Sequence, residues 1–376
     1  MTTWGRFERE FNTIIEDLKR HSELIDKEVN AHNIIEAREM RETLKSQLAQ
    51  EQKQQTARQM QGVVTWLRLD DTDQIVVFDF LAKVGESHPG TVEWVSSKTQ
   101  VKSWLRNTPD TPFLCLQGAP GTGKSVIVAR LVSFLNLSKS SLVIRHFCSS
   151  THDSTHYDQI IKSLLLQFAQ HDADLVAHIY EEYVGSRQAV VSDLEKLLEL
   201  AVDLLSGNGQ RSVHLLLDGL DECPINKQRR LLRLVERLTT AGGNCKVLVS
   251  TRDTSLLPER LKKSVFSLAE EKVCLRDAIA NYTRIRLLAM SDKLRELGIA
   301  EDDTKRISFQ IGERADGRQP LSPFACQQCP ELMKCVMVGM FLWATLVLNY
   351  LSANFFYTGD EFMKAIDSLP RELTAL

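Results

Sequence analysis

The stretch from Gly118 to Ser125 reads GAPGTGKS, and it decides the fold. It fits the pattern G-x-x-x-x-G-K-[ST], in which glycines let the backbone turn tightly around phosphates and the lysine contacts the β- and γ-phosphates. An apolar run at 113–117 precedes it and an amphipathic run at 125–137 follows it. Strand, loop and helix in this order predict a phosphate-binding loop at a helix N-terminus, although a glycine-rich turn without a ligand is an alternative. The predicted nucleotide-binding residues are Gly118, Ala119, Pro120, Gly121, Thr122, Gly123, Lys124 and Ser125.

Apolar runs alternate with amphipathic segments on both sides of this loop. The apolar runs are at 113–117, 142–148, 213–217, 246–250 and 264–268, and the amphipathic segments are at 124–137, 157–170, 192–205 and 226–240. Nearly continuous apolar strands that alternate with helices are typical of a parallel sheet that is covered on both faces. We therefore expect an α/β fold, a P-loop NTPase sheet flanked by helices.

A carboxylate at the end of a buried strand is the second requirement of a magnesium-dependent NTPase. The run VHLLLD at 213–218 ends in Asp218, and Asp221 and Glu222 follow closely. We expect Asp218 and the Ser125 hydroxyl to hold Mg²⁺, with Asp218 acting through a coordinated water. Asp221 and Glu222 are candidates for orienting or deprotonating the attacking water. Taken alone, such a strand end is more often a helix N-cap.

The run KVLVSTR at 246–252 places Arg252 after another predicted strand. Ligands of open α/β sheets bind at the carboxyl ends of the strands, so Arg252 is a candidate for contacting the γ-phosphate. The alternative is a surface arginine in a salt bridge.

The remainder of the chain is predicted to be helical. The first proline is Pro89, and the apolar residues Phe7, Phe11, Ile14, Leu18 and Ile25 lie on one helix face. Glu28 interrupts this stripe, so we expect a small antiparallel helical unit rather than a long coiled coil. Residues 38–58 are mostly polar and favour a solvated helix over a partner-binding one. The predicted division is an N-terminal helical domain at 1–88, a linker at 89–111, a nucleotide-binding domain at 112–272 and a helical segment at 273–376.

Composition excludes several classes of protein. Lys plus Arg is 46 against 49 for Asp plus Glu, which argues against a main role in binding nucleic acid or anionic lipid. The run VMVGMFLWATLVL at 336–348 has only thirteen uncharged residues, too few for a membrane span, and predicts a buried helix. The charged N-terminal residues predict no secretory signal, and the eight cysteines are sparse. These features predict a cytoplasmic protein with reduced thiols.

Other chemistry-bearing residues are weaker candidates. Cys326, Cys329 and Cys335 suggest zinc, but no histidine follows His214 and a tetrahedral site needs a fourth ligand. We therefore expect no metal there. His146, His152 and His156 are interpreted as ordinary loop histidines, and Cys115 and Cys148 as core thiols.

Together, GAPGTGKS at 118–125, HLLLDGLDE at 214–222 and KVLVSTR at 246–252 resemble the NACHT NTPases of the signal-transduction class. The likeness is to the filamentous-fungal group described as having a nephrocystin-3-like N-terminal domain. The segments PGTVEW at 89–94 and MFLWATLVL at 340–348 also resemble that group. The resemblance implies a molecular switch in which ATP or GTP, bound with Mg²⁺, controls self-association or a signalling partner. Fungal members are linked to nonself recognition and programmed cell death.

Two departures from that family modify the expectation. Family members continue past the equivalent of residue 376 into a winged helix and repeats, so the chain is expected to be truncated and any hydrolysis to be slow. Residues 318–339 separate ERADG from MFLWA, which are continuous in the family, and we interpret them as a translated intron or a lineage-specific loop.

Two other functions fit the sequence. The first is an interaction protein that binds nucleotide for structure and never hydrolyses it. The second is a helical scaffold whose phosphate-binding loop is vestigial. A kinase is less favoured, because no acceptor-substrate signature is present.

Overall fold

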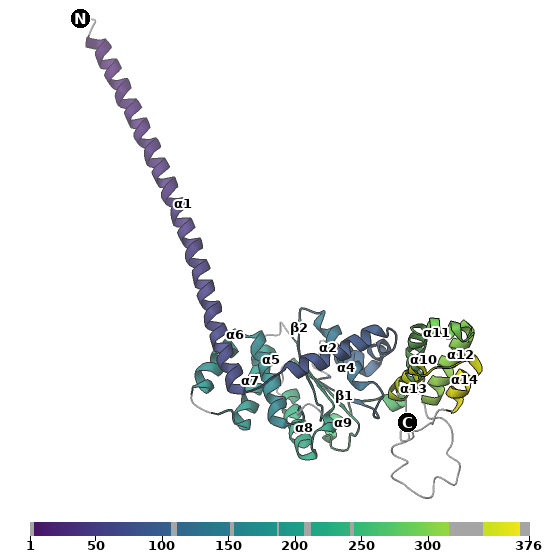
Figure 1. The fold of residues 1–376 in the computed structure, drawn as a ribbon. Helices are drawn as coiled ribbons and strands as arrows, with labels where there is room; N and C mark the ends of the chain where they lie inside the picture. Colours follow the sequence, from purple (N-terminus) through teal and green to yellow (C-terminus); the bar gives the residue numbers. More distant parts are fainter. Residues whose placement is uncertain are drawn as a thin grey trace.

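The computed structural model describes residues 4–106, 111–150, 154–185, 188–206, 212–240, 244–315 and 341–368 (Figure 1). Its centre is one sheet of five parallel strands in the order β2-β3-β4-β1-β5. The strands are β1 (Phe113–Gln117), β2 (Ser141–Phe147), β3 (Ser212–Asp218), β4 (Cys245–Thr251) and β5 (Val265–Ser267). All five fall on the predicted apolar runs, which confirms the predicted fold class.

Helices cover both faces of the sheet, because the strands alternate their apolar side chains between two cores. Leu215 and Leu217 face one core, whereas Leu216 between them faces the other. The first core is closed by α5 (Tyr157–His171), α7 (Val191–Ser206) and α8 (Ile225–Thr240). The second is closed by α2 (Thr72–Ser87), α3 (Thr99–Leu105) and α4 (Lys124–Asn136). The shorter elements are η1 (Glu93–Ser97), α6 (Ala173–Ile179), η2 (Tyr180–Val184), η3 (Leu220–Glu222), α9 (Glu259–Lys262) and η4 (Leu268–Glu270).

Two glutamine side chains bind the outer backbone of the edge strand β2. Gln74 of α2 accepts from Phe147 N at 2.7 Å and donates to Phe147 O at 3.0 Å. Gln167 of α5 makes the same pair of bonds with Arg145, at 3.0 and 2.8 Å. Each amide therefore takes the place of a neighbouring strand at these two residues.

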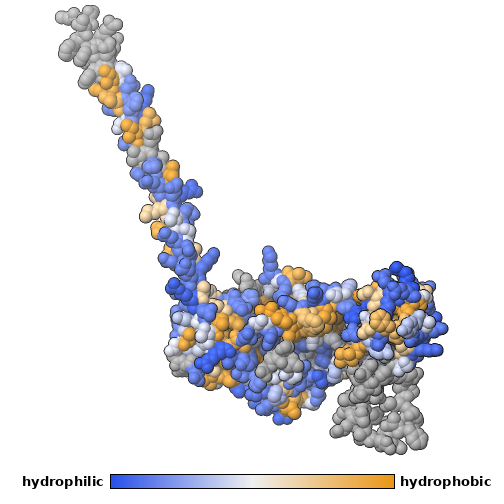
Figure 2. All heavy atoms as spheres, in the orientation of Figure 1, coloured by the Kyte–Doolittle hydropathy of each residue, from blue (hydrophilic) through white to orange (hydrophobic). Residues whose placement is uncertain are grey.

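The sequence predicted a small antiparallel helical unit at the N-terminus. This prediction is wrong, because residues 4–67 form one helix, α1 (Trp4–Leu67). At 1.5 Å per residue this helix is about 96 Å long, and it projects from the body as a rod (Figure 1). Only its end is anchored, with Val63 and Leu67 buried in the first core. Ile14, Leu18 and Leu48 are exposed, and Figure 2 shows hydrophobic side chains along the rod. Residues 38–58 are exposed almost throughout, as a solvated helix would be.

The C-terminal helices form a separate core beside the sheet domain. They are α10 (Lys272–Leu288), α11 (Ser291–Glu296), α12 (Glu301–Ala315), α13 (Phe341–Ala353) and α14 (Gly359–Ser368). Trp343, Val347 and Leu351 of α13 are buried there, which confirms the predicted buried helix for the described part of the apolar run, 341–348. Within the described ranges, no helix is both long enough and apolar enough to cross a bilayer. The predicted domain boundaries remain predictions.

Candidate functional site

The glycine-rich loop connects β1 to α4, as predicted, and its glycines have conformations that other residues rarely adopt. Gly121 and Gly123 have φ of +75° and +86°. A Cβ on Gly118 would lie 2.7 Å from Thr122 Oγ1 and 3.0 Å from Leu268 Cδ1. The loop thus requires glycine at Gly118 for space and at the other two positions for backbone geometry. A hydrogen bond inside the loop holds its turn: Thr122 Oγ1 donates to Ala119 O at 2.8 Å, next to Gly118.

Lys124, the first residue of α4, points its ammonium group back onto the loop. Its Nζ donates to Gly118 O at 2.8 Å and to Ala119 O at 3.1 Å. Burial lowers the pKa of Lys124, while the nearby acids Asp221 and Asp218 act in the opposite direction. Its ammonium therefore sits in partly dehydrated surroundings, where contact with an anion would be strengthened.

Asp218 ends β3 and is buried beside the loop. Its Oδ1 accepts from Ser250 Oγ at 2.5 Å, and Ser250 Oγ accepts from Gly219 N at 2.9 Å. Burial raises the pKa of Asp218, and hydrogen bonds from Ser125 and Ser250 offset only part of that rise. Ser250 was not among the predicted site residues, although the sequence placed it at the polar end of a predicted strand; its neighbourhood to β3 comes from the structure.

The donor set at this point fits Mg²⁺. Ser125 Oγ and the Asp218 carboxylate are hard oxygen ligands, which this ion prefers. Asp218 is also a buried acid with a raised pKa, and a divalent cation beside it would offset the cost of its charge. The residues present thus fit the ion, and the assignment of Ser125 and Asp218 to it remains a prediction.

Asp221, Glu222 and Arg252 lie at the same edge of the sheet and line the same cavity. Arg252 Nε lies 2.6 Å from Asp221 Oδ2, and the Arg252 backbone N–H donates to Asp221 Oδ1 at 3.1 Å. Glu222 Oε2 accepts from Ser150 N at 2.9 Å. The salt bridge considered as the alternative for Arg252 is therefore present, although the Arg252 side chain is half exposed and also lines the cavity. The roles predicted for these three residues remain predictions.

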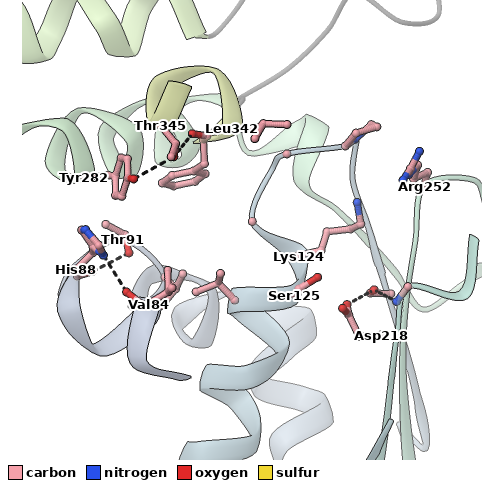
Figure 3. Close-up of a pocket in the computed structure, with 18 of the residues that line it drawn as sticks. Val84, His88, Thr91, Lys124, Ser125, Asp218, Arg252, Tyr282, Leu342 and Thr345 are labelled. Carbon is pink, nitrogen blue, oxygen red and sulfur yellow. Dashed lines mark hydrogen bonds between the residues drawn. The ribbon is translucent and has the colours of Figure 1, made fainter. Parts of the chain in front are cut away.

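The cavity has a volume of about 450 Å³ and a second, more apolar end that the sequence analysis missed. Val84, His88 and Thr91 line it from the segment before the sheet, and Tyr282, Phe341 and Thr345 line it from α10 and α13. Figure 3 shows Val84, His88, Thr91, Tyr282 and Thr345 across from Lys124, Ser125, Asp218 and Arg252. Nothing in a single sequence links α2 to α13, so only the fold brings this end together.

Several weaker candidates are resolved by the structure. His146 is not a loop residue but lies in β2, buried, with Nε2 donating to Ser154 O at 2.9 Å. Cys115 is a core thiol whose pKa burial raises to about 12, and Cys148 is also buried. Within the described ranges, no three His, Cys, Asp or Glu side chains are grouped to hold a metal. His152, the possible zinc cysteines and the whole of 318–339 lie outside the described residues.

Comparison with known proteins agrees with this architecture. Residues 90–252 match the family model described as Nephrocystin 3, N-terminal. Vegetative incompatibility protein HET-E-1 of Podospora anserina is 23% identical over 268 residues, which are 69% of this chain and 18% of that protein. The chain thus spans less than a fifth of this curated relative. These matches confirm the resemblance that the motifs indicated: the chain carries a NACHT-like, nucleotide-binding NTPase domain.

Solved structures overlap less closely. Cdc6p from Pyrobaculum aerophilum has a TM-score of 0.37 at 17% identity, and the overlap covers 71% of this chain and 68% of that chain. A Walker-type ATPase of Pyrococcus abyssi has a TM-score of 0.41 at 14% identity, with 73% and 70% covered. Both scores are low, so the fold assignment depends on the strand order described above.

Proposed function

We propose that this chain is the nucleotide-binding part of a NACHT-type signalling switch, which binds ATP or GTP with Mg²⁺ and hydrolyses it slowly. One observation carries the proposal: a single cavity is lined by the phosphate-binding loop, Asp218, Arg252 and residues of the helical segment. A triphosphate on the loop would draw Lys124 from the carbonyls of Gly118 and Ala119 to the phosphate oxygens. Mg²⁺, when bound, would neutralise charge on those oxygens.

The switch part of the proposal depends on the helical segment. Phe341, the first residue of α13, packs against the loop so closely that a Cβ on Gly123 would lie 3.5 Å from its ring. A nucleotide in the cavity would therefore contact the sheet domain and the helical segment together. A ligand that binds one arrangement of two units more tightly shifts the population toward it. Self-association, or capture of a signalling partner, is the output that we propose for this shift.

The biological role that we propose is based on the similarity to HET-E-1. HET-E-1 is described as a vegetative incompatibility protein, and this favours a role in fungal nonself recognition or cell-death signalling for this chain. A cytoplasmic location belongs to the same proposal.

A nucleotide-bound protein that does not hydrolyse is the second candidate, and one observation favours it. Asp221 is bonded to Arg252 and Glu222 to Ser150, so both acids already have partners. These contacts restrict how far either carboxylate can turn toward an attacking water.

A phosphate-release assay with Mg²⁺ and ATP or GTP separates the two candidates. We expect slow release by the wild-type chain, no release by Glu222→Gln with nucleotide binding retained, and normal release by Glu296→Gln, an exposed glutamate on α11. Binding without release in the wild type would favour the second candidate. No binding of either nucleotide at millimolar concentration would refute both.

A further inference from the structure

The projecting part of α1 carries large apolar side chains that the described part of the chain leaves exposed. We call six of them the α1 face: Ile14, Leu18, Ile25, Met40, Leu44 and Leu48. Figure 2 shows hydrophobic side chains along this rod. We propose that the α1 face pairs with the α1 face of a second copy of this chain, in antiparallel orientation. The pairing needs no nucleotide, so the inference goes beyond the proposed function.

The six residues share one side of the helix. Successive residues of an α-helix are turned by about 100°, so Ile14 and Leu48 lie at the two limits of an arc of about 160° that contains the other four. Of the fourteen Asp, Glu, Lys and Arg residues between 13 and 50, only Lys19, Asp26 and Glu36 fall within this arc. The exposed large apolar residues of this stretch outside the arc are Leu24, Ile34 and Ile35. A helix with a broad apolar side and a charged side packs its apolar side against other elements.

The body of the molecule leaves the α1 face accessible. Only the end of α1 is anchored, where Val63 and Leu67 enter the first core. Leu48, the residue of the face nearest to that anchor, precedes Val63 by about 22 Å along the helix axis. Figure 1 shows α1 projecting away from every other helix over this stretch. A partner helix could therefore lie along the face without displacing any described element.

The length of the face is sufficient for a specific dimer. From Ile14 to Leu48 the helix extends about 51 Å, and an α-helix with its side chains is about 10 Å wide. A contact along this length would bury roughly 500 Å² on each copy, or about 1,000 Å² in total. Specific interfaces between proteins bury about this area or more. One further copy of α1 thus supplies the area that a specific interface needs.

Charges beside the α1 face favour the antiparallel orientation. Glu16 and Glu23 flank one side of the face toward the tip of the rod. Arg41 and Lys45 flank the same side nearer the body, with Lys27 between the two pairs. A two-fold axis near residue 31 brings this side of both helices together.

In that arrangement each acid lies beside a base of the other chain. Glu16 comes within about one residue of the level of Lys45 of the second copy, and Glu23 within about two residues of the level of Arg41. In a parallel pair, by contrast, acids would lie level with acids. Complementary charges fix the orientation of an interface more than they add to its affinity.

The test is sedimentation equilibrium of the full chain without nucleotide, and we expect the wild type to form dimers as its concentration rises. Leu18→Glu places a carboxylate between the paired faces and should weaken the dimer at least about tenfold, because a buried charge without a partner is costly. Leu24→Glu is the matched control. Leu24 is also exposed but lies on the opposite side of the helix, so this variant should dimerise as the wild type does.

Charge reversal tests the orientation. Glu16→Lys and Lys45→Glu each replace two attractive pairs per dimer by repulsive ones, and each should weaken the dimer about 2- to 30-fold. The double variant should regain wild-type association, because its two charges are exchanged and attract again.

The outcomes separate this inference from the proposed function. A wild-type chain that stays monomeric at every concentration overturns the inference, and so do equal effects of Leu18→Glu and Leu24→Glu. Failure of the double variant to regain association overturns the antiparallel orientation. Dimers that form only with nucleotide overturn pairing through α1 but support the proposed switch. Loss of nucleotide binding, in turn, would refute the proposed function and leave this pairing intact.

Discussion

Replacing Lys124 with alanine should remove most of the stabilisation that a nucleotide gives to the fold. A ligand at 100 times its dissociation constant raises the free energy of unfolding by about 2.7 kcal/mol. Loss of charge-assisted hydrogen bonds from Lys124 to phosphate should cost about 1.5–3 kcal/mol of binding, or roughly 12- to 140-fold in affinity. At the same ligand concentration, Lys124→Ala should therefore gain only about 0.3–1.3 kcal/mol.

The nucleotide-free variant should be nearly as stable as the wild type. Lys124→Ala loses two bonds to loop carbonyls, but it also removes a buried ammonium whose pKa burial lowers. Urea unfolding followed by tryptophan fluorescence is a suitable assay, because Trp104 is buried in the core beneath the sheet. Lys272→Ala, at an exposed lysine of α10, is the control and should show the full gain. The same gain of about 2.7 kcal/mol in Lys124→Ala would refute the placement of the phosphates.

Three further changes test other parts of the molecule. Asp218→Asn should abolish the difference in nucleotide affinity between Mg²⁺ and EDTA, because the buried carboxylate whose charge the ion offsets is gone; a retained difference would exclude Asp218 from the ion's site. Burial lowers the pKa of His146 from its ordinary 6.5 to about 4. Between pH 4 and pH 6.5 the unfolded chain therefore binds more protons at this residue than the folded chain does. Stability should therefore fall by up to about 1.4 kcal/mol per unit as pH drops from 6.5 to 4, and urea midpoints at pH 7.5 and 5 should differ less in His146→Gln. Gln74→Leu should destabilise the fold by about 1–3 kcal/mol in urea unfolding, since Phe147 N loses its partner while Phe147 O keeps only Ser154 Oγ, whereas Gln52→Leu on exposed α1 should have little effect.

The sheet and the phosphate end of the site could be predicted because their signals are local. A glycine-rich loop needs its residue types in one short stretch, and buried parallel strands are nearly continuous apolar runs. Asp218 and Ser250 then lie together because the carboxyl ends of β3 and β4 meet at one edge. The orientation of Arg252 toward Asp221 depends on both loops at once, and the sequence left that choice open.

The apolar end of the cavity and the N-terminal helix could not be predicted in the same way. His88, Tyr282 and Phe341 come together from segments that are far apart in the chain, and each alone looks like an ordinary core or turn residue. For α1, Glu28 interrupts the apolar stripe and suggested a turn. Most residues around it are good helix formers, however, and no proline or glycine stands between Gly5 and Gly62 to end the helix.

The glutamines beside β2 limit how copies of this chain can associate. An uncovered outer strand is a template for joining sheets end to end, which leads to aggregates as readily as to useful assemblies. Here Gln74 and Gln167 already bind the backbone N–H and C=O groups of Phe147 and Arg145, with which an incoming strand would have to pair. A second copy of the folded chain would therefore be unable to extend the sheet at these two residues of β2, and separation of α2 from the sheet would expose the backbone groups of Phe147 again.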